Sequence, residues 1–181
     1  EYYKGIFTTL SSCASRQLEE VTFRRATISV PELMATAGKY FRKVYKGNKA
    51  HIDFKIQLLE GRITGDWNQL RFLLENLIDE ACSVTLDGAV CLSAREDGEF
   101  IRFLFTDMRR EKTREELNQL FYPDLSRMTA GEKGELYGTE YLVCKQIIRD
   151  HDEFAGRRGC RINAEPGKEG GFTIYFTLPK K

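Results

Sequence analysis

The 181-residue sequence lacks several features that would assign it to a simple class of protein. Its apolar runs are too short to span a bilayer, and its first residues, EYYKGIFTTL, do not have the charge and hydropathy pattern of a signal peptide. The 28 basic and 27 acidic side chains nearly cancel, which argues against nucleic acid and anionic membranes as partners. We therefore expect a cytoplasmic domain that contacts neither. Because the chain starts without Met on a helical pattern, we also expect it to be part of a longer protein.

Metal-binding patterns are missing as well. The five cysteines are scattered and no C-x-x-C occurs, while only two histidines, His51 and His151, could assist a metal site. The sequence therefore predicts no zinc site but free thiols in a reducing compartment, at Cys13, Cys82, Cys91, Cys144 and Cys160.

What the sequence does have is clear helical and alternating periodicity. Helical spacing predicts helices over residues 1–20, 31–45, 66–85, 113–121 and about 139–151. Alternation predicts strands over residues 21–30, 51–58, 88–95, 99–107, 159–165 and 171–178, with a turn at 61–65 and a polar loop at about 123–137. This order indicates an α/β fold: a two-layer α/β sandwich, helices on one face of a mixed sheet, with an N-terminal helix ahead of it.

Two segments carry polar residues of interest, and the second is built like one half of a nucleotide site. In the helix over 66–85, Asn76 and Glu80 stand one turn apart and so share a face. In FTDMRREKTREELNQLF, a strand ends at Asp107 and a glycine-free connection follows, Met108-Arg109-Arg110-Glu111. A backbone that wraps a phosphate or purine usually needs glycine there.

From about residue 25 to 179, these segments in their order resemble the catalytic ATP-binding domain of sensor histidine kinases, which has the Bergerat fold of the GHKL ATPase superfamily. The pattern most resembles divergent members from Bacteroidetes. The resemblance rests on five blocks, similar in turn to the N box, the strand into the first glycine box, the F box, the second glycine box and the closing hairpin: Asp66–Thr85, Glu99–Asp107, Leu120–Pro123, Gly138–His151 and Arg161–Pro179.

The resemblance implies residue roles and cofactors. It assigns residues 1–20 to the end of a dimerisation helix and residues 21–181 to the histidine kinase-like ATPase domain. ATP and Mg²⁺ would be the cofactors, with Asn76 and Glu80 on the metal. Asp107 would accept a hydrogen bond from the adenine amino group, and Gly138 would admit a phosphate. The full nucleotide-binding set would be Asn76, Asp107, Phe121 and Gly138, with no catalytic residue assigned.

Several positions depart from the family pattern. Glu80 replaces an asparagine and Ser83 a lysine, which together remove positive charge and add negative charge. The glycines of the two boxes read Arg109, Glu111 and Glu140. These changes favour a pseudokinase, a signalling or interaction module of a two-component-type protein with impaired or absent ATP binding. The alternative is an active domain that transfers the γ-phosphoryl group to a histidine outside this fragment.

Simpler readings stay open for each site residue. Asn76 and Glu80 could be solvated, and Asp107 could be a turn or cap residue. The basic cluster Arg109, Arg110, Lys112 and Arg114 could be an exposed turn, a docking patch for an acidic partner, or the charge partner of Glu80 or Glu140. His151 is expected at a helix C-terminus, where partial positive charge suits the dipole. Expected partners are other domains of the same longer protein and a signalling protein, and residues 1–20 allow a homodimer.

Overall fold

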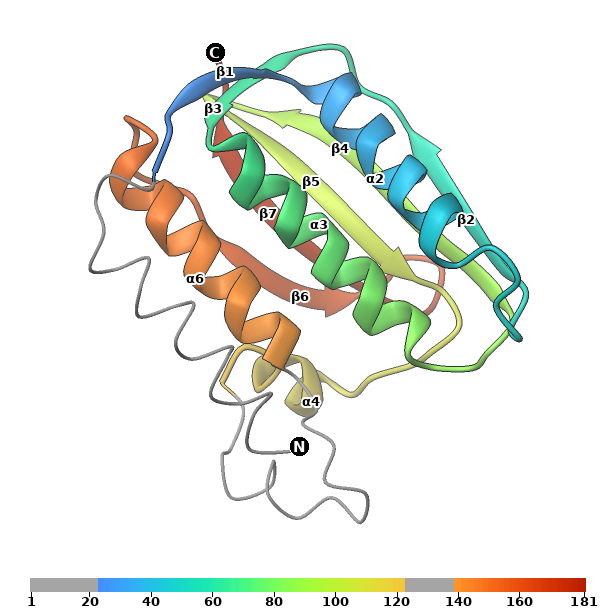
Figure 1. Ribbon diagram of the computed structural model, residues 1–181. Helices are drawn as coiled ribbons and strands as arrows, with labels where there is room; N and C mark the ends of the chain where they lie inside the picture. Colours follow the sequence, from blue (N-terminus) through green and yellow to red (C-terminus); the bar gives the residue numbers. More distant parts are fainter. Residues whose placement is uncertain (1–22, 123–138) are drawn as a thin grey trace, which may run out of the picture.

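A computed structural model describes residues 23–122 and 139–181, which form a sheet with helices on one face (Figure 1). The main sheet has five strands in the order β2-β4-β5-β7-β6. Only β2 and β4 pair in parallel, and the other neighbours are antiparallel, so the sheet is mixed. Its strands are β2 (Ile52–Gln57), β4 (Gly88–Asp97), β5 (Phe100–Asp107), β6 (Ile162–Pro166) and β7 (Phe172–Pro179).

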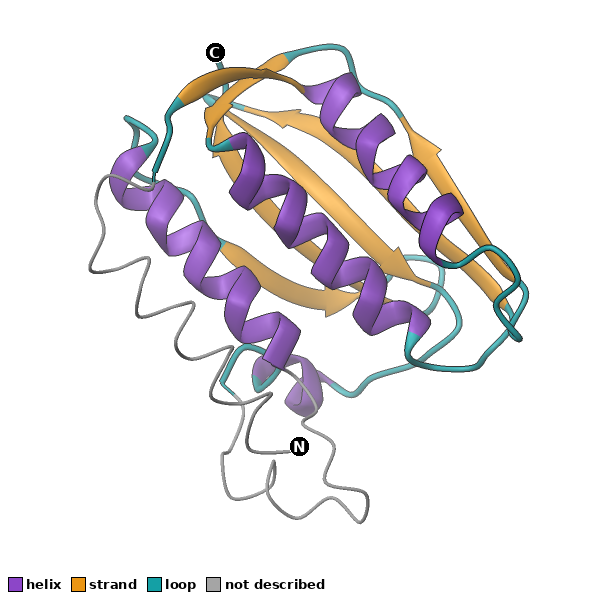
Figure 2. Cartoon of the chain, viewed as in Figure 1, coloured by secondary structure: helices purple, strands orange, loops and turns teal. Residues whose placement is uncertain are grey.

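Three long helices lie on the same face of this sheet, α2 (Val30–Val44), α3 (Trp67–Cys82) and α6 (Thr139–Phe154) (Figure 2). The central helix, α3, buries the apolar stripe of the sequence, including Leu70, Leu73 and Leu77, between the sheet and the other two helices. On the sheet side, Phe103 of β5 stacks on Phe176 of β7 with 5.0 Å between ring centroids. The predicted two-layer sandwich is confirmed.

A second, two-stranded sheet corrects the prediction. Residues 61–65 were expected to form a turn, but Arg62–Gly65 is strand β3 and pairs antiparallel with β1, Ala26–Ser29. Among the described residues, the strand predicted over 21–30 is present only as Ala26–Ser29, and the helix predicted over 113–121 is α4, which covers only Arg114–Asn118.

The helix α3 begins at a polar junction that joins three parts of the chain. The Asp66 side chain caps the helix by accepting from the Gln69 N–H at 3.1 Å, and it also accepts from the Arg24 N–H at 2.7 Å. The Asp66 N–H donates to Nε2 of His151 at 3.0 Å. His151 lies in the last turn of α6, as expected, but it is fully buried and accepts this bond, so the expected partial positive charge is wrong. A ring nitrogen that accepts this bond carries no proton, so the imidazole is neutral here.

Some expectations fall outside the described residues: the helix over 1–20, the loop over 123–137, Cys13 and Gly138. The other four cysteines are free thiols, as expected. In the part of the chain that is described, no helix combines the length and apolar character needed to cross a membrane.

Candidate nucleotide site

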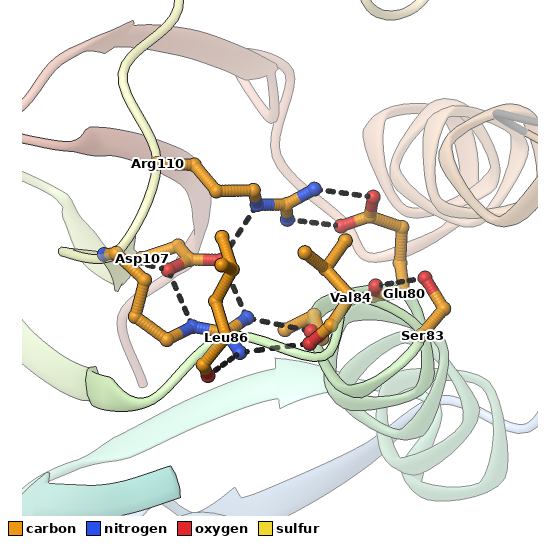
Figure 3. Close-up of polar contacts among 8 residues, drawn as sticks. Glu80, Ser83, Val84, Leu86, Asp107 and Arg110 are labelled. Carbon is orange, nitrogen blue, oxygen red and sulfur yellow. Dashed lines mark hydrogen bonds and ion pairs between the residues drawn. The ribbon is translucent and has the colours of Figure 1, made fainter. Parts of the chain in front are cut away.

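The candidate site lies where β5 ends beside the last turn of α3. Asp107 closes β5 in the middle of the sheet, between Val90 of β4 and Phe172 of β7, and is only 1% exposed. Figure 3 shows Asp107 on one side and Glu80 of α3 on the other, with Arg110 between them. The sheet and α3 therefore bring together Asp107, predicted to bind adenine, and Glu80, predicted to bind the metal ion, which stand 27 positions apart in the sequence.

Arg109 fills the space beside the Asp107 carboxylate. Its backbone N–H and its Nε both donate to Oδ1 at 3.0 Å, and its Nη2 donates to Oδ2 at 2.9 Å. The remaining guanidinium donors reach three backbone carbonyls at the end of α3: Ala81 at 2.6 Å, Val84 at 3.1 Å and Leu86 at 2.9 Å. All five guanidinium N–H groups thus have an acceptor, and the side chain is fully buried.

Arg110 links the two carboxylates. Its Nε donates to Oδ2 of Asp107 at 3.0 Å, and its two terminal nitrogens donate to the two oxygens of Glu80 at 3.3 and 3.0 Å. The guanidinium also lies over the Phe172 ring, 5.3 Å from its centroid. This forked contact with a carboxylate is a strong ion-pair geometry, and both side chains are largely buried.

The arginines set the charge state of the site. Burial alone would raise the pKa of the Asp107 carboxyl, but the hydrogen bonds from Arg109 and the charges of both arginines hold that pKa below its ordinary value. Burial likewise acts to lower the pKa of Arg110, and the hydrogen bond and charge of Glu80 more than offset it, so that this pKa is raised. The cluster is therefore two cations and two anions at neutral pH.

Two glycines make room for this arrangement. A side chain at Gly88 would begin 2.7 Å from Cγ of Arg109, so only glycine leaves space for the arginine stem. A Cβ at Gly171 would lie 2.1 Å from the backbone oxygen of Asp107, and Gly171 has a φ of +70°, which favours glycine. The Gly171 N–H in turn donates to Glu111 at 2.9 Å.

The other residues singled out in the sequence do not take part in this cluster, and each makes contacts of its own. Asn76 turns its amide back to the Phe72 carbonyl, at 2.7 Å. Phe121 is buried and packs edge-to-face on Tyr141, with 5.8 Å between centroids. Ser83, at the position of the family lysine, caps α3 by donating to the Glu80 carbonyl at 2.6 Å. Gly138 is not among the described residues.

The first two residues of the basic cluster are therefore not part of an exposed turn, although Arg114 is exposed. Arg109 and Arg110 are internal, and Arg110 is the charge partner of Glu80, one of the readings left open by the sequence. Lys112 lies over the Phe172 ring at 5.3 Å, whereas Met108 is 40% exposed. The absence of glycine was evident in the sequence, but its consequence was missed: an arginine in place of glycine can supply the donors that a ligand would otherwise bring.

The described residues include no group of three or more His, Cys, Asp or Glu side chains arranged to hold a metal ion. Within the metal set expected from the sequence, both Glu80 oxygens accept from Arg110, and the Asn76 amide nitrogen donates to a helix carbonyl. The Glu80 carboxylate is therefore already paired with a cationic group, the Arg110 guanidinium.

Comparison with known proteins defines the class. The model of the family described as histidine kinase-, DNA gyrase B- and HSP90-like ATPase matches residues 65–181, well over half of the chain. The chain belongs to this ATPase family. The Bacteroidetes-type subdivision stays a prediction.

One curated relative of the chain is a sensory kinase. The chain is 26% identical over 176 residues to the adaptive-response sensory kinase SasA of Thermosynechococcus vestitus, which covers 96% of this chain and 44% of that protein. The chain thus spans less than half the length of this curated relative.

Solved structures agree in fold. The catalytic domain of histidine kinase ThkA superposes with a TM-score of 0.66 at 19% identity, over 87% of this chain and 96% of that one. Full-length ShkA in complex with AMPPNP gives 0.71 at 16% identity, over 95% of this chain and 34% of that one. Histidine kinase AdeS of Acinetobacter baumannii gives 0.66 at 15% identity, over 96% and 74% of the two chains.

Proposed function

We propose that this domain is a pseudokinase module of a two-component-type signalling protein, in which Arg109 occupies the position that the adenine amino group would take at Asp107. The observation that carries the proposal is the saturation of Asp107. A carboxylate offers about four lone-pair positions. Four N–H groups, from the Arg109 backbone, its side chain and Arg110, already donate to the two oxygens.

ATP with Mg²⁺ does not fit this arrangement of side chains. A purine at Asp107 would have to displace a buried arginine that also holds three carbonyls at the end of α3. Displacement would leave Asp107 and those carbonyls to find new partners, and unpaired buried polar groups are costly. On the phosphate side, Glu80 is neutralised by Arg110 instead of a metal ion. The proposed module therefore binds nucleotide weakly or not at all.

The competing proposal is an active domain that binds ATP–Mg²⁺ and transfers the γ-phosphoryl group to a histidine outside this chain. Asp107 and Asn76 match the family positions, and one structural relative, ShkA, was solved with AMPPNP. This proposal requires Arg109 and Arg110 to leave Asp107 and Glu80 before nucleotide enters.

A thermal-shift titration with ATP and AMPPNP, with and without Mg²⁺, separates the two proposals. A ligand at about a hundred times its dissociation constant stabilises a fold by about 2.7 kcal/mol, which raises the midpoint by several degrees. We expect no rise for the wild-type chain at millimolar nucleotide. A Mg²⁺-dependent rise that disappears in Asp107→Asn would overturn the pseudokinase proposal in favour of the active domain.

A pair of arginine variants tests whether Arg109 is the obstacle. Arg109→Ala frees the acceptors of Asp107, and each titration is referred to that variant's own ligand-free midpoint. Arg95→Ala, at an exposed position of β4, is the matched control, because it also removes one positive charge. A nucleotide-dependent rise in Arg109→Ala alone would identify Arg109 as the block. If neither variant responds, removal of Arg109 is not sufficient to restore binding, and the substitutions on the phosphate side also exclude nucleotide.

The same proposal includes a cytoplasmic location, other domains of a longer protein and a signalling protein as partners, and a homodimer through residues 1–20. It is supported by the family and by relatives more than twice as long as this chain. Multi-angle light scattering of the chain with and without residues 1–20 tests the homodimer, because loss of this segment should convert a dimer to a monomer.

A further inference from the structure

Four exposed cations gather at the C-terminal end of α2 and in the turn that follows it. Lys39, Arg42 and Lys43 are spaced by three and four residues and so share one face of the helix, and Lys46 comes just after the helix end. None of the four forms an ion pair with any residue of the described chain. We call these four residues the basic patch.

The basic patch is a local excess of charge on a nearly neutral protein. Residues 33–52 contain no Asp or Glu, whereas the whole chain has a net charge of only +1. The carboxylate that reaches this end of α2, Asp79 of α3, accepts hydrogen bonds from the Tyr40 and Tyr45 hydroxyls at 2.7 and 2.6 Å. Another carboxylate of α3, Glu75, pairs with Arg71 on its own helix. The patch is therefore available to an external anion.

The cations surround an open depression of about 620 Å³ that also has aromatic lining, from Phe41 and Tyr45. Phe41 stacks on Phe54 of β2 and on Tyr45, with centroid distances of 5.0 and 6.0 Å. An apolar side chain could rest on these rings while carboxylates on either side reach the cations. This combination suits a peptide better than a small inorganic anion.

The conformation of the basic patch is fixed in the unbound protein by contacts between α2 and the rest of the domain. Two tyrosines of the α2 end share one oxygen of Asp79, which ties the end of α2 to the last turn of α3. Figure 1 shows α2 at the β2 edge of the sheet, on the side away from α6. Because α2 buries Leu33, Met34 and Ala37 in the core, its exposed cationic face is fixed in orientation. A preorganised surface loses less entropy when it binds.

We propose that the basic patch is the docking site for an acidic segment of a partner protein, whose carboxylates pair with Lys39, Arg42, Lys43 and Lys46 and whose apolar side chain packs on Phe41 and Tyr45. The proposal does not depend on nucleotide binding. One reading left open by the sequence was a basic docking patch at Arg109, Arg110, Lys112 and Arg114. The structure turns Arg109 and Arg110 inward, whereas the four cations of the basic patch are exposed.

A membrane or a nucleic acid fits the same surface less well. Helices that lie on bilayers insert an apolar face, but here the apolar face of α2 is in the core and Val44 is the one large apolar side chain of this helix that is markedly exposed. Nucleic-acid surfaces usually extend over a strongly positive domain. On this chain the acidic residues nearly equal the basic ones, so a long polyanion would also meet carboxylates.

The test uses the full 181-residue chain and a short fluorescein-labelled peptide rich in Glu and Leu, with a peptide of the same sequence carrying Gln in place of Glu as control. Binding is measured by fluorescence anisotropy at low and at physiological salt, and located by ¹H–¹⁵N correlation spectra. We expect the Glu peptide to bind, to weaken with salt, and to shift resonances of residues 39–46. The Gln peptide should bind at least about tenfold more weakly, because its charge pairs are lost.

Charge-reversal variants locate the site. Lys39→Glu, Arg42→Glu and Lys43→Glu combined should weaken the Glu peptide at least about tenfold. The matched control reverses three exposed cations elsewhere, Arg149→Glu, Arg161→Glu and Lys168→Glu, and should retain most of the affinity. Both variants are first checked for an unchanged fold by their spectra.

Three results would overturn the proposal. Equal weakening by both charge reversals would mean that only net charge matters. Absence of peptide binding at low salt would show that the basic patch does not bind acidic peptides. Binding to phosphatidylserine vesicles or to a single-stranded oligonucleotide through residues 39–46, without peptide binding, would assign the patch to a membrane or nucleic acid instead.

Discussion

Asp107 and Arg109 stand two positions apart and are joined by three hydrogen bonds, one from the backbone and two from the guanidinium group. Both side chains are almost completely buried. The carboxylate that the family pattern assigns to adenine is thus an internal anchor for the connection after β5 and for the end of α3. Its substitution should therefore affect the stability of the fold even when no nucleotide is present.

Asp107→Ala should lower the free energy of unfolding by about 3–5 kcal/mol, because it leaves Arg109 and Arg110 as buried cations with one counter-ion fewer. Urea denaturation followed by circular dichroism measures the change. Asp97→Ala is the matched control, since it breaks a partly exposed ion pair with Arg102 and should cost less than about 1 kcal/mol. Equal effects of the two substitutions would show that the buried cluster does not stabilise the fold.

The same carboxylate should make stability depend on pH. The folded-state pKa of Asp107 is held below its ordinary value, so its stabilising contribution is complete above about pH 4 and is lost as the pH falls through the lowered folded value. The difference in unfolding free energy between wild type and Asp107→Asn should therefore shrink as the pH is lowered from about 6 to 3. A difference that stays constant over this range would contradict the assigned pKa.

The effects of substituting Tyr40 and Tyr45, which both donate to Asp79, on the free energy of unfolding should not be additive. Tyr40→Phe and Tyr45→Phe each remove one hydroxyl donor and should cost about 1.5 kcal/mol. The double variant should cost more than the sum, because Asp79 then loses both donors while it stays partly buried. A strictly additive result would show that the two hydroxyls act independently.

Tyr175→Phe is the control for this pair. Its hydroxyl makes no hydrogen bond among the described residues, and its ring lies under Arg102 at 4.6 Å. Removing the hydroxyl should change the unfolding free energy by less than about 0.5 kcal/mol.

Gly171→Ala should be more destabilising than Gly98→Ala, although both glycines have positive φ, +70° and +60°. An alanine at Gly98 meets nothing within 4 Å and should cost about 1 kcal/mol through backbone strain alone. An alanine at Gly171 would also collide with the backbone of Asp107 and should cost clearly more. Thermal and urea midpoints of the two variants measure the difference, and similar values would mean that the contact between Gly171 and Asp107 relaxes easily.

Most of the fold could be predicted because its signals are local and periodic. The apolar stripe of α3 and the alternation of β5 each reflect one face turned to the core. Strand β3 was missed because its four residues, Arg62–Gly65, give too short a pattern, and because its partner β1 lies 33 or more residues earlier in the chain. The neutral, buried state of His151 was missed for a similar reason, since its hydrogen-bond donor, Asp66, belongs to a different helix.

The sequence by itself determined the sandwich, the positions of Asn76, Glu80 and Asp107, and the loss of the glycines that would surround a phosphate. Only the tertiary structure decided what replaced them. The residues next to Arg109 in the sequence are typical of a solvated, charged turn. It is buried because residues 81–86 and Asp107 offer five acceptors in one place, and those acceptors come together only when α3 packs on the sheet. A long-range match of donors to acceptors leaves no periodic trace in the sequence.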